Sequence, residues 1–381
     1  MGLPVAEKEN ALTPLPSRTV RTLAIVAGIA SAVAIVALGY GLFTAGAGSS
    51  TLTAVAQTPA PAPAPTAAEN PPAAIDPWTG SAAATGSTLA TTASAGAATS
   101  TAAKTAPLAV SPSVAGAGKL DLYRGLGSWV DIYDTKAWDN PTAAVADMAA
   151  HGVRTLYVET GNSRSSFAIF NPTGQQAFIR ECHAHGMRVV AWYLPDLKPG
   201  SADFSRISQA IAFTTADGQK FDSFALDIES TVVSSEAERN RNLEALTKQI
   251  RALVGRAYPL GGIIPSPVGI AKKAGYWDAF PYSMVASYYD VFLPMAYYTY
   301  HGSTATAAGA DALANVRILR SQPGCATVPI HMIGGIAENS SAGEVKAFVS
   351  AVRQTKCFGA SLYGWPGTSA AHWQALAAIG R

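Results

Sequence analysis

Residues 221–229, Phe-Asp-Ser-Phe-Ala-Leu-Asp-Ile-Glu, are the stretch from which this chain is best interpreted. Three large apolar residues alternate there with small or acidic ones, which predicts a β-strand with one apolar face. The opposite face ends in two carboxylates, Asp227 and Glu229. A strand that ends in this way indicates acid–base chemistry, provided that the fold places both groups in a pocket.

This strand belongs to a repeating pattern over residues 119–381, in which eight predicted strands alternate with eight predicted helices. The strands are expected at 124–131, 154–159, 188–194, 222–229, 261–266, 291–297, 329–335 and 359–365, and the helices at 141–151, 173–185, 203–214, 235–254, 276–288, 306–320, 342–355 and 369–379. The alternation predicts an α/β fold with a parallel sheet, and eight units match a (β/α)₈ TIM barrel. A doubly wound open sheet is the alternative, but Gly125-Leu126-Gly127 lacks the third glycine of a dinucleotide-binding turn.

The N-terminal part of the chain differs in composition from the barrel. Residues 22–43 are apolar and uncharged over a length that suffices for a single transmembrane helix. Basic residues precede this run and none follows before Lys104, so we expect residues 1–21 in the cytoplasm and the C-terminal domain outside the cell. The alternative is a secreted protein, cleaved after a small-x-small site at residues 54–56. The lipid bilayer is thus an expected partner of the helix.

Residues 44–118 are dominated by alanine, proline, threonine and serine, with almost no large apolar side chain. Such a segment cannot bury enough surface to offset its chain entropy, so we expect a disordered linker. The barrel domain would then be tethered to the membrane by a long flexible segment.

Charge and motif content exclude several functions. The formal net charge is +2 without a basic stripe, so no nucleic acid partner is expected. Neither an HExxH motif nor a cluster of metal ligands occurs, and we expect no metal and no cofactor. Of three cysteines, Cys325 and Cys357 precede neighbouring strands and could form a disulfide, whereas Cys182 is expected to be a buried thiol. The sequence does not indicate an oligomeric state.

Alternation along each strand predicts which side chains face into the barrel near its C-terminal end, where barrel enzymes place their sites. The candidates are Trp129 and Asp131, Tyr157 and Glu159, Tyr193, Asp227 and Glu229, Met295 and Tyr297, and Tyr363 and Trp365. Together they predict an acidic centre ringed by tryptophan and tyrosine. That combination suits a sugar, because aromatic rings stack on a pyranose and carboxylates act on the glycosidic oxygen.

The sequence resembles the chitinase-type family 18 glycoside hydrolases, whose fourth strand carries Asp-x-x-Asp-x-Asp-x-Glu. Residues 222–229 fit this frame with Ala225 in place of the middle aspartate, and residues 295–298 fit the family's Met-x-Tyr-Asp with Tyr298 in place of the aspartate. Trp365 stands where the family has a floor tryptophan. The Asp-x-Glu strand end is also similar, more weakly, to that of the family 25 muramidases.

The resemblance implies a glycosidase acting on a polysaccharide or peptidoglycan. Glu229 would be the general acid, Asp227 would stabilise the positive charge or orient an N-acetyl group, and Tyr297 would donate a hydrogen bond to that group. The remaining mouth residues would bind substrate. A second version uses Glu338 as a nucleophile opposite Glu229. The alternatives are an inactive barrel that binds cell-wall glycan, favoured by Ala225, and an unrelated barrel enzyme.

Overall fold

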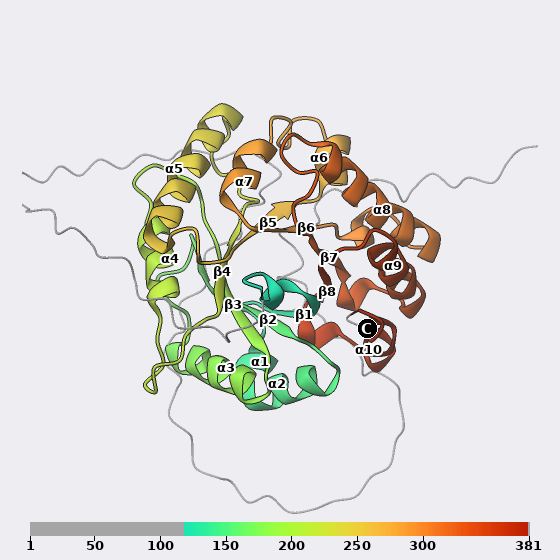
Figure 1. The fold of residues 1–381 in the computed structure, drawn as a ribbon, viewed down its shortest axis with the longest axis horizontal. Helices are drawn as coiled ribbons and strands as arrows, with labels where there is room; N and C mark the ends of the chain where they lie inside the picture. The colour runs from blue at the N-terminus through green and yellow to red at the C-terminus, as the bar shows by residue number, and fades with distance from the viewer. Residues whose placement is uncertain (1–117, 380–381) are drawn as a thin grey trace, which may run out of the picture. The chain divides into compact units, whose positions relative to one another are not determined.

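The computed structural model describes residues 118–379, which form a closed barrel of eight parallel strands surrounded by helices (Figure 1). The strands follow one another around the barrel in chain order, and β8 pairs with β1 to close it. They are β1 (Gly125–Val130), β2 (Thr155–Asn162), β3 (Arg188–Leu194), β4 (Ser223–Asp227), β5 (Leu260–Pro265), β6 (Val291–Met295), β7 (His331–Ile336) and β8 (Gly359–Tyr363). The predicted (β/α)₈ fold is confirmed.

The helices are α1 (Thr135–Asp139), α2 (Pro141–Ala150), α3 (Pro172–Ala184), α4 (Asp203–Ala212), α5 (Glu236–Val254), α6 (Pro267–Lys272), α7 (Tyr282–Tyr288), α8 (Ala305–Ser321), α9 (Ala342–Gln354) and α10 (Ala370–Leu376). Short 3₁₀ turns are η1 (Asp121–Tyr123), η2 (Tyr298–Tyr300), η3 (Ala337–Asn339) and η4 (Trp365–Gly367). The helix expected at 276–288 begins only at Tyr282, because Pro281 occupies the N-cap. Ser341 and Glu344 form a capping box at the start of α9.

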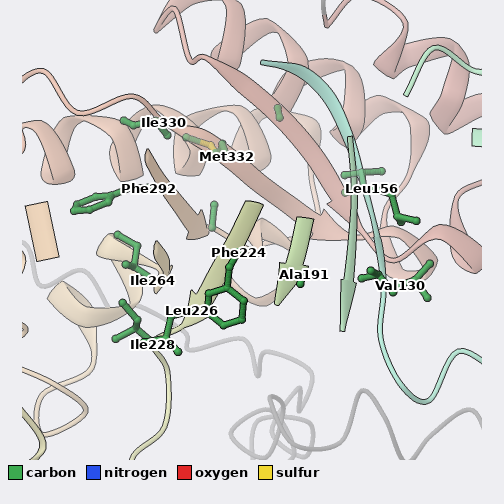
Figure 2. Packing of buried hydrophobic residues seen from close by; sticks show 14 of the residues in the cluster. Val130, Leu156, Ala191, Phe224, Leu226, Ile228, Ile264, Phe292, Ile330 and Met332 are labelled. Carbon is green, nitrogen blue, oxygen red and sulfur yellow. The ribbon is translucent and has the colours of Figure 1, made fainter. Parts of the chain in front are cut away.

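Alternation along the strands divides the buried side chains into two cores. Figure 2 shows part of the outer core, in which Phe224 and Leu226 of β4 and Ile228 just beyond it pack in the layer between the strands and the helices. The inner core lies inside the barrel and contains Ala225 of the same strand together with aromatic side chains of β1, β2 and β3. The period of two in residues 221–229 therefore separates the two layers, as the sequence predicts.

Small residues make room for a buried imidazole at the centre of the barrel. The Nδ1 atom of His331 lies 2.9 Å from the carbonyl oxygen of Tyr123, and its Nε2 atom lies 3.2 Å from Ser361 Oγ. Burial lowers the pKa of His331 to about 4, so the ring is neutral at neutral pH. A Cβ atom at Gly127 or Gly359 would collide with this ring.

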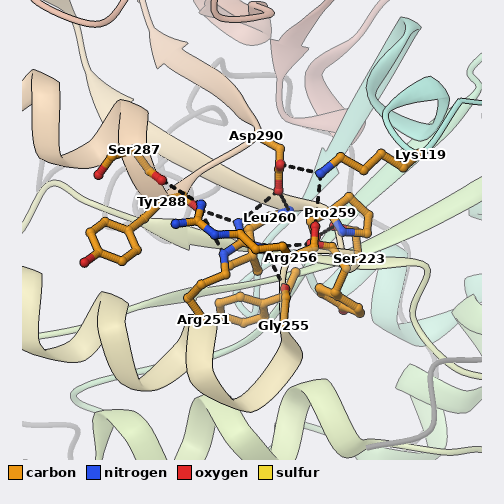
Figure 3. A network of polar contacts seen from close by, with 12 residues as sticks. Lys119, Ser223, Arg251, Gly255, Arg256, Pro259, Leu260, Ser287, Tyr288 and Asp290 are labelled. Atoms are coloured by element: carbon orange, nitrogen blue, oxygen red, sulfur yellow. Dashed lines mark hydrogen bonds and ion pairs between the residues drawn. The ribbon is translucent and has the colours of Figure 1, made fainter. Parts of the chain in front are cut away.

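An ionic network closes the N-terminal end of the barrel, opposite the carboxyl ends of the strands (Figure 3). Lys119 donates to Asp290 Oδ1 over 2.7 Å, and Arg251 donates to Asp290 Oδ2 over 2.9 Å. The same carboxylate accepts the backbone N–H of Leu260 at the start of β5. The first described residues of the chain are therefore held at this end of the barrel.

The cytoplasmic segment (1–21), the transmembrane helix (22–43) and the linker predicted for 44–118, apart from its last residue, lie outside the described residues, as does the alternative cleavage site at 54–56. Within residues 118–379, no helix has the length and apolar character needed to cross a membrane.

Candidate functional site

Acidic residues of three strands gather at the carboxyl end of the barrel. Asp131 directly follows β1, Glu159 lies in β2, Asp227 ends β4, and Glu229 stands two residues beyond Asp227. Burial raises the pKa of Asp227 well above its usual value, and the charges of Glu229 and Glu159 raise it further. Asp131 and Glu229 likewise contribute to the raised pKa of Glu159. The four groups therefore form one cluster, as the strand parity predicts.

Two polar atoms of this region are buried without a partner among the described residues. Asp227 is 6% exposed, and its Oδ1 atom accepts no hydrogen bond. Trp192 of β3 belongs to the inner core, and its indole Nε1 atom donates none. An unsatisfied buried acceptor and an unsatisfied buried donor are each costly, so they indicate a place where a polar ligand completes the hydrogen bonding.

Glu229 is the less buried member of the Asp227–Glu229 pair. Burial raises its pKa to about 7, against the opposing charge of Arg164. The phenol of Tyr276 lies 3.5 Å from the backbone carbonyl of Glu229, and the charge of Glu229 also affects the pKa of Tyr276. A carboxyl group with a pKa near 7 is protonated in about half of the molecules at neutral pH and can donate its proton to a leaving group.

Both oxygen atoms of the Glu159 carboxyl group are held by hydrogen bonds. Its Oε2 atom accepts the backbone N–H of Ile132 over 3.0 Å, and its Oε1 atom accepts the side-chain amide of Asn162 over 3.1 Å. Burial raises its pKa to about 8 despite these two hydrogen bonds. Glu159 therefore presents a fixed carboxyl group that is neutral at pH 7.

Aromatic rings line the barrel beside the acidic cluster. The rings of Trp129 and Tyr157 stack with centroids 4.3 Å apart, and Trp192 meets Trp129 edge to face at 6.1 Å. Tyr363 lies 6.2 Å from Trp129 and donates from its hydroxyl group to Asp131 Oδ2 over 2.8 Å. Tyr363 thus contacts two other predicted mouth residues, Trp129 and Asp131.

Tyr297 extends this wall from the end of β6. Its ring packs edge to face against Tyr363 at 5.9 Å and against Tyr300 at 5.9 Å. Its backbone has φ 38° and ψ 56°, a left-handed conformation that is uncommon for a residue with a side chain and that is found at functional sites. Met295, one strand repeat earlier, is buried in the inner core, as its parity predicts.

The expectation that Tyr193 faces the mouth is wrong. Its side chain lies in the outer core, and its hydroxyl group donates to Asp203 of α4 over 3.0 Å. Trp192 takes the inward position instead and was missed by the sequence analysis. Val190 stands two residues before Trp192 and also faces inward, so a period of two starting from Val190 would have predicted the inward position of Trp192. Because Trp192 and Tyr193 are both aromatic, side-chain type alone does not show which of them faces the barrel interior.

Trp365 also lies away from the acidic cluster. It falls beyond the end of β8, in η4, and is buried in the outer core. Its indole N–H donates to Asp147 of α2 over 2.8 Å, and Lys136 lies over its ring. The alternation that holds within β8 does not continue into the following turn, so the inward position predicted for Trp365 is corrected.

The predicted disulfide is absent, because all three cysteines are free thiols. The sulfur atom of Cys325 is directed towards the carbonyl oxygens of Tyr282 and Pro323, whereas that of Cys357 contacts the hydroxyl group of Thr355. Cys182 is fully buried in α3, as expected. The two cysteines precede neighbouring strands, but their side chains pack against different elements.

Glu338 is exposed in η3, where its side chain contacts Gly367 of η4. The charge of Glu338 affects the pKa of Asp134, which burial raises to about 7. The charge of Glu338 does not contribute to the raised pKa of Asp227 or of Glu229. This position does not favour Glu338 as a nucleophile opposite Glu229. Nowhere in residues 118–379 do three or more histidine, cysteine or acidic residues form a group that could hold a metal ion.

Comparison by sequence gives no relatives, since no family model and no curated protein matches this chain. Comparison by structure gives glycoside hydrolases. A chitinase from Bacteroides thetaiotaomicron superposes with a TM-score of 0.51 at 10% identity, covering 68% of this chain and 96% of the chitinase.

Two further solved structures show lower similarity. A family 18 chitinase from Cycas revoluta in complex with allosamidin has a TM-score of 0.46 at 11% identity and covers 67% of this chain and 98% of its own. An endo-1,4-beta-mannanase from Rhizomucor miehei has a TM-score of 0.47 at 8% identity and covers 67% of this chain and 95% of its own. The resemblance to chitinase-type barrels inferred from the sequence is confirmed at the level of the fold.

Proposed function

We propose that this chain is a glycoside hydrolase that cleaves an N-acetylated or cell-wall glycan by carboxylate acid–base catalysis. The observation that carries the proposal is the buried pair Asp227 and Glu229, beside the aromatic residue Tyr297, with one oxygen of Asp227 unpartnered. A raised pKa for the proton donor and an adjacent carboxylate for the developing positive charge are the two requirements of glycosidic cleavage.

In the proposed reaction, Glu229 donates its proton to the glycosidic oxygen as the bond to the anomeric carbon breaks. Asp227, whose raised pKa keeps it protonated in the free site, orients a substrate N-acetyl group whose oxygen bonds to that carbon, or stabilises the developing positive charge once it has lost its own proton. Tyr297 donates a hydrogen bond to the same group. Water then attacks the anomeric carbon and returns a proton to Glu229, which restores the starting state.

The aromatic and acidic residues around this pair would bind the sugar. Tyr363, which is only partly buried, offers its ring, and Trp192 offers an indole N–H that has no partner among the described residues, while the buried Trp129 supports both rings. Glu159 and Asp131 offer oxygen atoms to sugar hydroxyl groups. The substrate would thus supply the hydrogen bonds that the described residues leave unmade.

The location of the enzyme follows from the sequence. Residues 22–43 would anchor the chain in the membrane, with the N-terminus in the cytoplasm and the barrel outside, and residues 44–118 would let the barrel reach the cell wall. Secretion after cleavage near residues 54–56 remains the alternative. Either arrangement exposes the barrel to extracellular glycans.

A second candidate function is glycan binding without hydrolysis. It is favoured by Ala225, which removes one carboxyl group of the family 18 motif from β4. Tyr298, which replaces another aspartate of that family, is buried in the outer core and bonds to Ser340. Neither substitution supplies a catalytic group of its own.

The test is the release of reducing ends by the full chain from peptidoglycan and from soluble N-acetylglucosamine oligomers. Glu229→Gln should lower the rate at least about 100-fold, the contribution of a general acid. Glu244→Gln, on the exposed face of α5, removes the same charge and should leave the rate unchanged. Binding by an inert wild-type chain would favour the second function, and absence of both binding and hydrolysis would refute the proposal.

A further inference from the structure

Two adjoining cavities lie at the end of the barrel opposite the acidic cluster. One of about 360 Å³ is bordered by the start of β1, the start of β8, the end of α9 and the residues after α10. The other, of about 560 Å³, lies between α9 and α10. The walls of both include Arg353 and Ala378, so the two form one continuous basic groove. Figure 1 shows α9 and α10 side by side at this edge of the barrel.

Among the described residues that line the groove, every charged side chain is a cation. The smaller cavity is bordered by Arg124, Arg154, Arg353 and Lys356, and the larger one adds Lys346. Of these five side chains only Arg124 has an ionic partner within residues 118–379, Asp121 at 3.0 Å. Three other cations at the same end of the barrel are matched: Lys119 and Arg251 pair with Asp290, and Arg188 pairs with Asp222.

Neighbouring contacts hold several of these cations over the cavity. Arg154 extends across Gly125, where a Cβ atom would come within 2.9 Å of its side chain. The guanidinium group of Arg124 lies 3.9 Å from the centre of the Phe358 ring. Lys356 follows α9 with φ 54°, a conformation that glycine normally provides at this point of a helix end. The chain therefore keeps a cation where glycine would be less strained.

The carboxyl end of α9 does not explain this charge. Its partial negative charge favours cations only within the last turn, which accounts for Arg353 and Lys356. Arg154 directly precedes β2, receives nothing from that helix and has no ionic partner within residues 118–379. Unmatched like charges from separate elements repel one another unless an anion lies between them.

We propose that the basic groove binds a linear anion with several phosphate groups. Arginine is suited to phosphate because its planar donors can form two parallel hydrogen bonds. A concave site fits a chain of phosphates that enters the groove better than it fits a flat lipid surface. The site faces away from the acidic cluster, so it is independent of the proposed hydrolysis.

The test is isothermal titration of the full chain with inorganic tripolyphosphate at low and high salt. Arg154→Gln/Arg353→Gln/Lys356→Gln should weaken binding at least tenfold. Arg241→Gln/Lys272→Gln/Arg317→Gln removes equal charge from other exposed positions and should bind as the wild type does. The affinity should fall with rising salt in the wild type and in the control, because the attraction is screened. Equal affinities of the two triple variants would overturn the proposal.

A single variant guards against misfolding of the triple one. Lys356→Gly removes one cation and relieves the left-handed backbone, so it should melt no lower than the wild type while binding tripolyphosphate several-fold more weakly. Unchanged binding by Lys356→Gly together with unchanged binding by the triple variant would rule the groove out.

Sedimentation with phosphatidylglycerol and phosphatidylcholine vesicles separates the groove from a lipid surface. We expect the wild type to bind tripolyphosphate. We also expect the triple substitution to leave vesicle binding unchanged. Loss of phosphatidylglycerol binding in the triple variant without any tripolyphosphate binding by the wild type would show a membrane-docking surface instead, and would refute the phosphate site.

Discussion

Replacing Glu229 by glutamine should stabilise the domain at every pH above about 4.5, and most strongly above pH 7. Burial raises the pKa of Glu229 to about 7 from a usual value of 4.5. Because the pKa is raised in the folded state, the contribution of the protonated Glu229 to stability is fully present below pH 4.5. This contribution decreases as pH rises and is lost above pH 7. The pKa of Glu229 in the folded state is thus about 2.5 above its usual value, a difference that corresponds to about 3 kcal/mol at 1.36 kcal/mol per pKa unit.

The glutamine side chain of Glu229→Gln is neutral at every pH, so this variant does not lose stability through ionisation at position 229 as pH rises. Its free energy of unfolding should equal that of the wild type at pH 4 and exceed it by up to about 3 kcal/mol at pH 8. Urea denaturation of the full chain, followed by tryptophan fluorescence at several pH values, measures the difference. The gain should develop between pH 4.5 and 7, in step with the ionisation of the carboxyl group.

A variant with the opposite sign provides the control. Hydrogen bonds from Thr215, Arg180 and Gln219 lower the pKa of the exposed Asp217, so its contribution to stability is present above the unfolded-state pKa and is lost as pH falls. Asp217→Asn should therefore be destabilised at pH 8 and approach the wild type in acid. If Glu229→Gln is no more stable than the wild type at pH 8, Glu229 is not a buried acid and the proposed proton donor fails.

Three further substitutions test the rest of the site and the barrel. Trp192→Phe removes an indole N–H that has no partner among the described residues, so it should weaken glycan binding about fivefold in titrations while changing the free energy of unfolding by less than about 1 kcal/mol. Tyr363→Phe deprives Asp131 of a donor and should lower the free energy of urea unfolding by about 1–2 kcal/mol, with no change counting against this contact. Gly359→Ala places a methyl group against His331 and the carbonyl oxygen of Tyr123, and should cost about 3 kcal/mol or prevent folding, as a melting curve would show.

Residues 221–229 show why the fold could be predicted from the sequence. A period of two assigns Phe224 and Leu226 to the outer core and Ala225 and Asp227 to the barrel interior, and the structure agrees. The assignment works because each strand of a closed barrel is buried on both faces, so large aliphatic side chains mark the face towards the helices. The location of Asp227 and Glu229 at one end then follows from the direction of the strand.

Alternation fails where neighbouring side chains both fit either layer. Trp192 and Tyr193 are adjacent aromatic residues, and size alone does not decide which one faces inward. The phenol of Tyr193 finds Asp203 of α4 in the outer layer, together with Arg206, whose guanidinium lies 3.4 Å from it. Asp203 and Arg206 belong to α4, so the contacts that hold Tyr193 in the outer layer form only when α4 packs on β3.

Elements beyond the strand ends are also outside the reach of periodicity. Trp365 lies in a turn after β8, and its direction is set by a hydrogen bond to Asp147, more than 200 positions away in the chain. Cys325 and Cys357 precede neighbouring strands, yet the local turns direct their sulfur atoms to different neighbours. The positions of these residues in the sequence predict the end of the barrel at which each of them lies. The directions of their side chains depend on tertiary contacts.

The register of the barrel explains why the acidity of the site does not depend on β4 alone. Glu159 of β2 pairs in register with Trp192 of β3, and Trp192 pairs with Ala225 of β4, so all three stand at one level. The inner face of β4 carries Ala225 at this level, and Glu159 brings a buried carboxyl group to the same level from two strands away. The electrostatic effect of Glu159 contributes to the raised pKa of Asp227. Because all strands of a closed barrel face one axis, carboxyl groups of different strands act on one another, and a motif confined to a single strand underestimates the acidity of this site.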